Sequence, residues 1–121
     1  MKKRTLILGA SPNSERYSNK ATLRLLEKGH PVFPVGIRKG EIGDHTILTD
    51  SPKIENIDTV TLYVGPKNQP PYYDYILNVI KPKRIIFNPG TENYQLVEMA
   101  KNKGIETEVA CTLVLLSLDN Y

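Results

Sequence analysis

The chain has 121 residues, of which 40% are hydrophobic and 24% charged, and its formal charge is +3. This composition predicts one globular domain spanning residues 1–121 and excludes a disordered chain, because enough apolar side chains are present to form a core. The positive charge is small and its basic residues are scattered, which argues against a nucleic-acid partner.

The cellular compartment is indicated by two features. A single cysteine excludes an intrachain disulfide and favours a reducing environment. The apolar run at residues 5–8 imitates the start of a signal peptide, but it stops at Gly9. No segment approaches the roughly 20 apolar residues of a membrane span. We therefore expect a cytoplasmic protein without a membrane segment.

In the first half of the chain, residues 5–8 predict a strand that is buried on both faces, because every side chain after Thr5 is aliphatic. A polar loop follows over residues 9–17. Residues 19–28 predict a helix with Ser18 as its N-cap and Gly29 as its stop. The expected core face of this helix consists of Ala21, Leu25 and Leu26.

The next segments predict mostly strands. Residues 32–35 form the second expected strand, and Pro31 and Pro34 indicate that it is either short or near a sheet edge, because proline cannot donate to a ladder. Residues 46–48 predict a short extended piece. Residues 59–64 are rich in β-branched side chains and predict a third strand.

The second half continues the alternation. Pro70 and Pro71 are expected to open a helix over about residues 72–80, because proline suits the first helical turn. A strand at residues 84–87, a helix at 92–103 and a strand at 105–109 follow. Residues 111–118 predict a short closing helix or turn.

This alternation predicts a Rossmann-like α/β fold, a doubly wound sheet of five mainly parallel strands with helices on both faces. Ligands of such sheets bind at the carboxyl ends of the strands. The segments that follow the expected strands are residues 9–11, 36–39, 65–67 and 88–90. Each contains a glycine, which permits close approach of a ligand to the backbone, although strand ends often turn with glycine in any case.

The first strand-to-helix loop is expected to bind an anion, because backbone N–H groups and the helix dipole point toward it. Gly9 permits the tight turn and Ser11 adds a hydroxyl. Arg16 and Lys20 flank the helix start, where they can neutralise a pyrophosphate. The alternative is that Ser18 only caps the helix and both cations are solvated.

The sequence argues against NAD as the ligand. The dinucleotide fingerprint has three glycines, whereas residues 9–14 contain one. An NAD site also places an acidic residue after the second strand, where this chain has Arg38 and Lys39. Two cations there suit a nucleotide with an extra ribose phosphate, either NADP or coenzyme A, unless the loop is merely an exposed basic loop.

We find no arrangement of residues typical of a catalytic or metal site. His30 is expected to be structural, because it precedes the second strand, away from the carboxyl ends. His45 is expected to be exposed, with an acid–base role as the alternative. Cys111 precedes an apolar run and is expected to be buried and inert; a mixed disulfide with the thiol of CoA is the alternative.

Three tyrosines, Tyr72, Tyr73 and Tyr75, lie at the start of the helix expected near the cleft. Their rings can stack on an adenine base. Their spacing equally suits packing against Ile76 and Ile80, and we favour packing.

Several short segments resemble the family of small standalone CoA-binding domain proteins, which are similar to the CoA-binding N-terminal domain of succinyl-CoA synthetase alpha subunits. The segments are residues 8–12, 16–18, 29–32, 34–36 and 88–90, and residues 61–67 and 110–114 resemble one branch of the family. The resemblance extends over essentially the whole chain and depends on the order and spacing of these segments.

The resemblance implies that CoA lies across the point where the strand order reverses. It implies contacts to the pyrophosphate from Gly9, Ala10, Ser11, Ser18 and Lys20. It places Gly36, Ile37, Arg38 and Lys39 near the adenosine ribose and its 3′-phosphate. It places Gly65, Pro66, Lys67, Asn88, Pro89 and Gly90 along the rest of the cleft. The chain departs from many relatives at residues 36–37 and 65–66, where they have an Asn-Pro and a basic pair.

Three functions remain open at this level. The first is binding of coenzyme A or an acyl-CoA by a non-catalytic carrier, sensor or regulatory protein, since the catalytic histidine of the synthetase lies in a domain that this chain lacks. The second is a minimal NADP-dependent oxidoreductase. The third is an interaction module with a vestigial nucleotide pocket.

Overall fold

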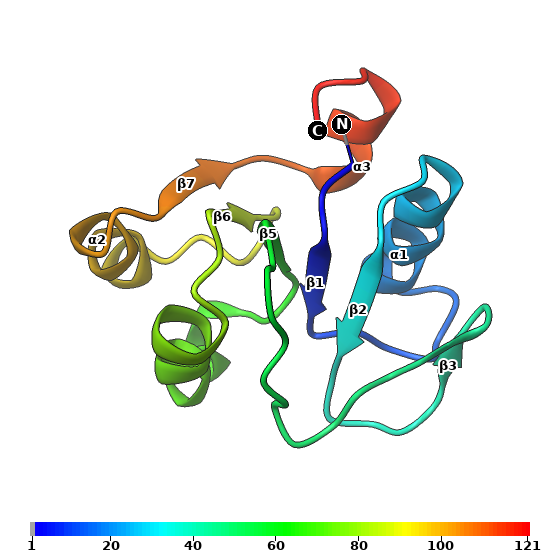
Figure 1. Cartoon of the computed structure of the whole chain (residues 1–121), viewed down its shortest axis with the longest axis horizontal. Helices are drawn as coiled ribbons and strands as arrows, with labels where there is room; N and C mark the ends of the chain where they lie inside the picture. The colour runs from blue at the N-terminus through cyan, green and yellow to red at the C-terminus, as the bar shows by residue number, and fades with distance from the viewer. Residues whose placement is uncertain (1) are drawn as a thin grey trace.

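The structure, a computed structural model, describes residues 2–121. Its strands of four residues are β1 (Thr5–Leu8), β2 (Val32–Val35), β5 (Thr59–Leu62), β6 (Arg84–Phe87) and β7 (Glu106–Val109). They form one parallel sheet in the order β2-β1-β5-β6-β7 (Figure 1). The order reverses between β1 and β5, and the predicted Rossmann-like α/β class is confirmed.

Helices cover both faces of this sheet (Figure 1). On one face lie α1 (Tyr17–Glu27) and α3 (Thr112–Ser117), whose Leu25 and Leu116 pack in one cluster with Ile7 of β1. On the other face lie α2 (Tyr94–Asn102) and a π-helix, η3 (Tyr75–Ile80). Because successive side chains of a strand point to opposite faces, β1, which is buried along its whole length, contributes Leu6 and Leu8 to one cluster and Ile7 to the other.

The edge position expected from Pro34 is confirmed, since β2 is the first strand of the sheet. Pro34 is in register with Ile7, and its carbonyl accepts a hydrogen bond from the Leu48 N–H (2.8 Å). The N and C=O groups of one strand residue point to the same side, so the missing N–H faces away from β1. The proline therefore removes no hydrogen bond from the β1–β2 ladder. Beside this edge, β3 (Glu41–Ile42) and β4 (His45–Thr46) form a small hairpin.

The start of α1 differs from the prediction. The helix begins at Tyr17, its N-cap is Arg16, and no side chain caps it. Ser18 is buried in the first turn, where its carbonyl accepts a hydrogen bond from the Thr22 hydroxyl (2.8 Å). The prediction of Ser18 as the N-cap is wrong, because the loop enters the helix two residues earlier than its polar composition indicates.

The helix predicted over residues 72–80 is not a regular α-helix. Two 3₁₀ turns, η1 (Pro66–Asn68) and η2 (Pro70–Tyr72), precede the π-helix η3. The π-helix ends where the Lys81 N–H donates to the Ile76 carbonyl (3.0 Å), five residues back. Its buried side chains are Tyr75, Ile76, Leu77 and Ile80, an apolar pattern that suits an α-helix equally well.

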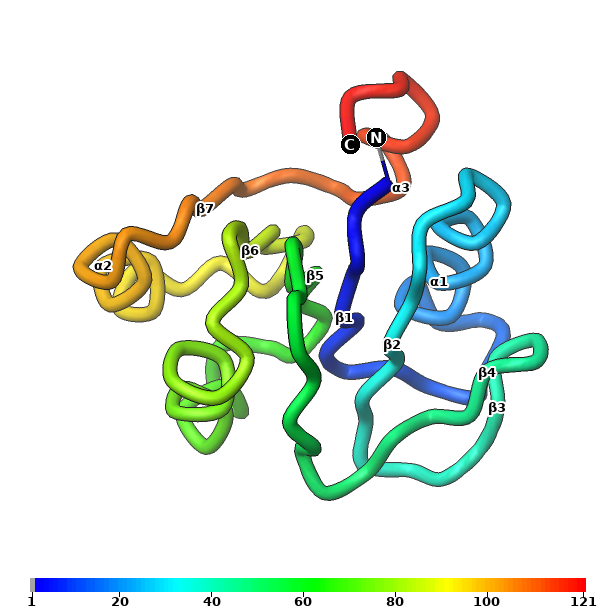
Figure 2. The backbone as a smooth tube through the Cα atoms, viewed as in Figure 1, coloured from blue at the N-terminus to red at the C-terminus, as the bar shows by residue number. Residues whose placement is uncertain are grey.

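Residues far apart in the chain meet at the amino end of β1, where Figure 2 shows the last residues returning to the start of the trace. The Lys3 ammonium donates to the Tyr121 backbone oxygen (3.0 Å), and the Tyr121 and Thr5 hydroxyls are 2.5 Å apart. The edge of the His30 ring packs on the Tyr121 ring with centroids 4.9 Å apart. This contact closes the end of the sheet opposite the glycine-containing loops.

The structural role expected for His30 is confirmed. Its ring is buried, and its Nδ1 accepts a hydrogen bond from the Lys3 N–H (3.0 Å). Burial is the main cause that lowers the pKa of His30 below its usual value of 6.5, and the nearby charges of Lys2, Lys3 and Arg84 lower it further. Protonation would also remove the acceptor to which the Lys3 N–H donates.

Because the folded-state pKa of His30 is lowered, the unfolded chain binds the proton more readily near pH 6. We predict that the His30 contribution to stability is complete above about pH 6.5 and is lost as the pH falls toward the folded-state pKa. Urea unfolding of wild type and His30→Asn between pH 5 and 8 checks this, because the Asn amide oxygen can replace Nδ1 as acceptor. The difference in free energy of unfolding between the two proteins should change with pH; a constant difference contradicts the prediction.

Candidate functional site

A cleft of about 610 Å³ opens at the carboxyl ends of β1, β2, β5 and β6. The four loops that follow these strands line it, as the strand topology predicts. The structure brings together most of the residues selected from the sequence. Those that line the cleft are Gly9, Ala10, Ser11, Arg16, Ser18, Gly36, Ile37, Arg38, Gly65, Pro89 and Gly90.

Other selected residues lie near the cleft but do not line it. These are Lys20, Lys39, Pro66, Lys67 and Asn88. Lys20 is exposed, and its ammonium lies over the ring of Tyr17 at 5.5 Å from the centroid. The lining residues that were not selected from the sequence are Pro12, Tyr17, Tyr63, Val64, Asn68 and Thr91. Four of them lie in segments of the family resemblance. Tyr63 and Val64, predicted within the third strand, follow it in the structure because β5 ends at Leu62.

Two glycines permit close contacts between loops at the cleft floor, Gly36 between the first two loops and Gly9 between the first loop and the loop after β5. A Cβ on Gly36 would lie 2.3 Å from the Ala10 carbonyl oxygen, which no side chain tolerates. Gly9 has a φ of 96°, and a Cβ there would lie 3.0 Å from the Tyr63 backbone. The N–H groups of Gly9 and Ala10 both donate to the Val35 carbonyl (3.0 Å each). The loop after β1 is therefore held directly against the end of β2.

The same loop leads into the amino end of α1. The Asn19 side chain donates to the Ser11 carbonyl (2.9 Å), which ties the loop to the helix. No side chain caps this end, and its first turn contains no acidic residue. The first-turn N–H groups and the helix dipole therefore present partial positive charge toward the cleft.

The charge of the lining residues has one sign. Arg16 and Arg38 line the cleft, and no Asp, Glu, His, Cys or Lys lies among its described lining residues. Each arginine adjoins an exposed apolar side chain at the mouth, Tyr17 (68% exposed) and Ile37 (84% exposed). The site therefore favours an anion that also carries an apolar or aromatic group.

Asn88 supports the cleft from behind. It is buried, and its amide group donates to the Thr61 hydroxyl (2.8 Å) and the Leu62 carbonyl (2.9 Å). Its side-chain oxygen accepts from the N–H of Thr112 (2.9 Å). The side chain thus joins the ends of β5 and β6 to the start of α3, which places the loop containing Pro89 and Gly90.

The tyrosines predicted near the cleft differ in position, since one lines the cleft and another is packed away from it. Tyr72 lines the cleft, whereas the Tyr75 hydroxyl donates to the Pro52 carbonyl (2.6 Å) and burial raises its pKa to about 12. Burial also raises the pKa of Tyr63, on the cleft wall, to about 12. The Tyr63 phenol therefore stays protonated at neutral pH.

The remaining candidate reactive groups lie elsewhere. Cys111, expected to be buried, is half-buried at the N-cap of α3, and His45, expected to be exposed, is half-buried in the β3–β4 hairpin. Neither residue lines the cleft.

Within residues 2–121, no group of three His, Cys, Asp or Glu side chains is placed to hold a metal ion. In the same described range, no helix has the length and apolar character needed to cross a membrane.

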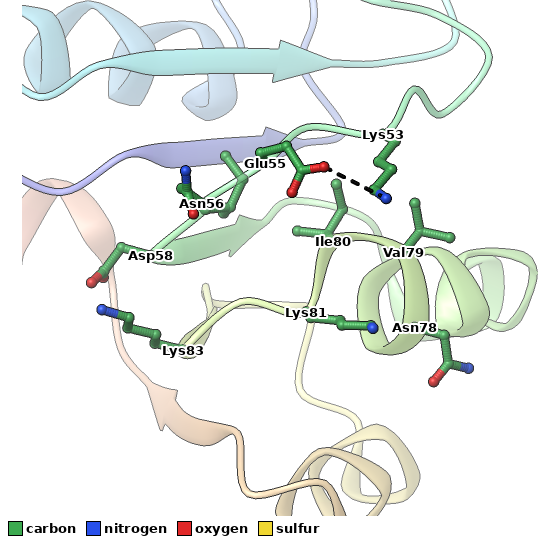
Figure 3. Close-up of a pocket in the computed structure, with 10 residues that line it drawn as sticks. Lys53, Glu55, Asn56, Asp58, Asn78, Val79, Ile80, Lys81 and Lys83 are labelled. Carbon is green, nitrogen blue, oxygen red and sulfur yellow. Dashed lines mark ion pairs between the residues drawn. The ribbon is translucent and has the colours of Figure 1, made fainter.

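A second cavity, of about 500 Å³, lies at the amino ends of β5 and β6 (Figure 3). Two of its three lysines have a carboxylate nearby. Lys53 pairs with Glu55 (3.5 Å), and Lys83 points toward Asp58 in Figure 3. Lys81 points away from both pairs, toward Asn78. Because its charges are mixed and spread apart, this cavity presents no focused positive field, unlike the cleft at the carboxyl ends.

Comparison with known proteins agrees with this architecture. Residues 3–117 match the family model described as a CoA binding domain. A crystal structure of an uncharacterized protein is 51% identical, with a TM-score of 0.97 and coverage of 100% of this chain and 99% of that chain. A hypothetical protein from Pyrococcus horikoshii OT3 is 28% identical, with a TM-score of 0.81 and coverage of 93% and 80%. The cell-free ID.343 structure from Thermus thermophilus, 19% identical with a TM-score of 0.84 and coverage of 99% and 91%, shows a shared fold alone. No curated protein matches.

The contact at the cleft floor makes two similar substitutions behave differently. In Gly36→Ala the new methyl group meets the Ala10 carbonyl oxygen, and we expect a loss of about 1–3 kcal/mol of stability or more. Gly65 also lines the cleft, but it has a φ of −63° and nothing lies within 4 Å of the position that a Cβ would take. Gly65→Ala should therefore leave the melting temperature nearly unchanged. Thermal unfolding of both variants checks this; equal melting temperatures would show that the two loops do not meet as described.

Proposed function

The chain belongs to the family of CoA-binding domains, and from this membership we propose that its cleft binds coenzyme A or an acyl-CoA. We propose a carrier, sensor or regulatory role without catalysis, carried out by the whole of residues 1–121 as one binding unit. The observation that carries the proposal is the cleft itself, which presents two arginines and an uncapped helix end and no carboxylate among its described lining residues.

The pyrophosphate of CoA suits the first loop. Two negative phosphates would meet the first-turn N–H groups of α1, the Ser11 hydroxyl and the Arg16 guanidinium, with Gly9 and Ala10 forming the cleft floor beside them. Glycine at position 9 leaves room for the Tyr63 backbone, which packs against this loop at the cleft floor. The exposed Lys20, one turn into the helix, would add to the positive potential without direct contact.

The 3′-phosphate of the ribose suits the second loop. Arg38 lines the cleft there and Lys39 is its exposed neighbour, while Ile37 offers an apolar surface for the adenosine. An arginine presents a planar donor group that matches two phosphate oxygens at once. This loop would therefore distinguish CoA from a nucleotide that lacks the extra phosphate.

The pantetheine arm suits the other half of the cleft. Its walls are the loops after β5 and β6, with Tyr63, Val64, Tyr72 and Pro89 among the lining residues. Pantetheine is uncharged and partly apolar, so a wall without ionised side chains is the chemical match. Lys67, Pro66 and Asn88 lie outside this lining and would act at a distance or through the backbone.

A binding role is supported by the chemistry of the lining groups. Serine, threonine, tyrosine, asparagine and arginine are the polar types present, and no side chain that commonly acts as a general base at neutral pH lines the cleft. Burial raises the pKa of Tyr63 on the cleft wall and so favours its protonated form. NADP shares an extra ribose phosphate with CoA and is the alternative ligand that the test must separate.

We expect wild-type protein to bind CoA more tightly than dephospho-CoA or NADP in isothermal titration calorimetry. Arg38→Gln should weaken CoA binding by about tenfold, because a charge-assisted hydrogen bond contributes roughly 1.5–3 kcal/mol. The same variant should bind dephospho-CoA with unchanged affinity, whereas Arg16→Gln should weaken both ligands.

Lys53→Gln, at the cavity on the other end of the sheet, is the matched control and should change neither affinity. Tighter binding of NADP than of CoA would favour the oxidoreductase. Binding of no nucleotide would favour an interaction module and contradict the proposal.

A further inference from the structure

Gln69 joins the two loops of the cleft wall that follows β5 and β6. Its side chain is fully buried between η1 and η2. Its Nε2 donates to the Val64 carbonyl (2.8 Å) and to the Thr91 carbonyl (2.8 Å), and both of these residues line the cleft. One amide group therefore spans two loops that are 27 residues apart in the chain.

The orientation of this amide follows from the backbone of α2. The Asn93 side-chain oxygen accepts from the N–H groups of Gln95 (3.1 Å) and Leu96 (3.3 Å) as the N-cap of the helix. Its Nδ2 must then point the other way, toward the Gln69 Oε1 (2.8 Å) and the Tyr73 hydroxyl (2.7 Å). Because the Gln69 Oε1 accepts the hydrogen bond from Asn93, the Nε2 is the atom that faces the Val64 and Thr91 carbonyls. A single arrangement of donors and acceptors satisfies the whole chain of hydrogen bonds.

Asn88 joins the ends of β5 and β6, but the two loops beyond these ends are linked to each other through Gln69. Among the hydrogen bonds of residues 2–121, none joins residues 63–65 directly to residues 89–91. Removing the Gln69 amide would leave two carbonyls and the Asn93 amide without these partners. Buried polar groups without partners are unfavourable, so the loops would move until solvent or other donors reach them.

We propose that Gln69 is a positioning residue that sets the spacing of this wall and thereby the affinity for the pantetheine arm of CoA. The inference rests on the proposed function. Gln69 acts on Val64 and Thr91, which follow β5 and β6, whereas Arg16 and Arg38 follow β1 and β2 on the other side of the strand-order reversal. The effect of Gln69 is therefore confined to the half of the cleft away from the nucleotide phosphates.

The test compares CoA with adenosine 3′,5′-bisphosphate, which keeps the 3′-phosphate and lacks the pantetheine arm. In Gln69→Glu, which keeps the shape of the side chain and loses its donor, we expect the dissociation constant of CoA to rise by about tenfold. The dissociation constant of the bisphosphate should change by less than about twofold, since its contacts lie on the other wall.

Asn93→Ser is the second variant, in case the buried carboxylate that Gln69→Glu introduces prevents folding. Serine is a good N-cap, so α2 keeps its cap, while the donor to Gln69 is lost and the Gln69 amide is free to rotate. We expect the same selective loss for CoA, smaller than that of Gln69→Glu. Gln95→Glu is the matched control, because it makes the same change as Gln69→Glu at an exposed position of α2 that does not line the cleft.

The outcomes separate the two proposals. Equal losses for CoA and the bisphosphate would show a general structural role and overturn the inference. Unchanged CoA affinity in both variants would overturn it while leaving the proposed function in place. If wild-type protein binds neither ligand, the proposed function fails and the inference fails with it.

Discussion

The contact between Gly36 and the Ala10 carbonyl is the constraint on which the rest of the site depends. It holds the loop after β1 against the end of β2, and two N–H groups bound to the Val35 carbonyl reinforce it. Because the loops touch, the amino end of α1 lies at the mouth of the same cleft as the loop after β2. Arg16 and Arg38, 22 residues apart in the chain, thus line one cavity. The contact between the two loops thereby brings both arginines to one focused positive site.

The other wall is held by side chains rather than by glycine contacts. Gln69 joins the loops after β5 and β6 through their carbonyls, and Asn88 joins the strand ends and α3 behind them. The two walls also differ in charge, because both arginines of the lining belong to the first wall. A ligand with an anionic half and a neutral half fits this division. Coenzyme A has that division, with its three phosphates at one end and pantetheine at the other.

Much of this architecture could be predicted from the sequence. The boundaries of β1, β2 and β6 agree with the prediction because aliphatic and β-branched runs end at glycine, asparagine or proline. The cleft loops were selected because parallel strands end at one edge of the sheet. The π-helix was not predicted, since its buried residues have α-helical spacing too. Gln69 was not selected, because its role depends on carbonyls of two distant loops, which no local pattern contains. Lys20 and Lys67 were selected for charge, but their side chains do not line the cleft.

The most direct test of the central claim is a titration of ¹⁵N-labelled protein with CoA, followed by the amide resonances of its glycines. Gly9, Gly36, Gly65 and Gly90 follow strands and line the cleft, whereas Gly29 and Gly104 precede strands at the opposite end of the sheet. We predict that the first four resonances shift with CoA concentration and that the last two do not move. Shifts confined to Gly29 and Gly104, or no shift at all, would contradict the assignment of the cleft as the CoA site.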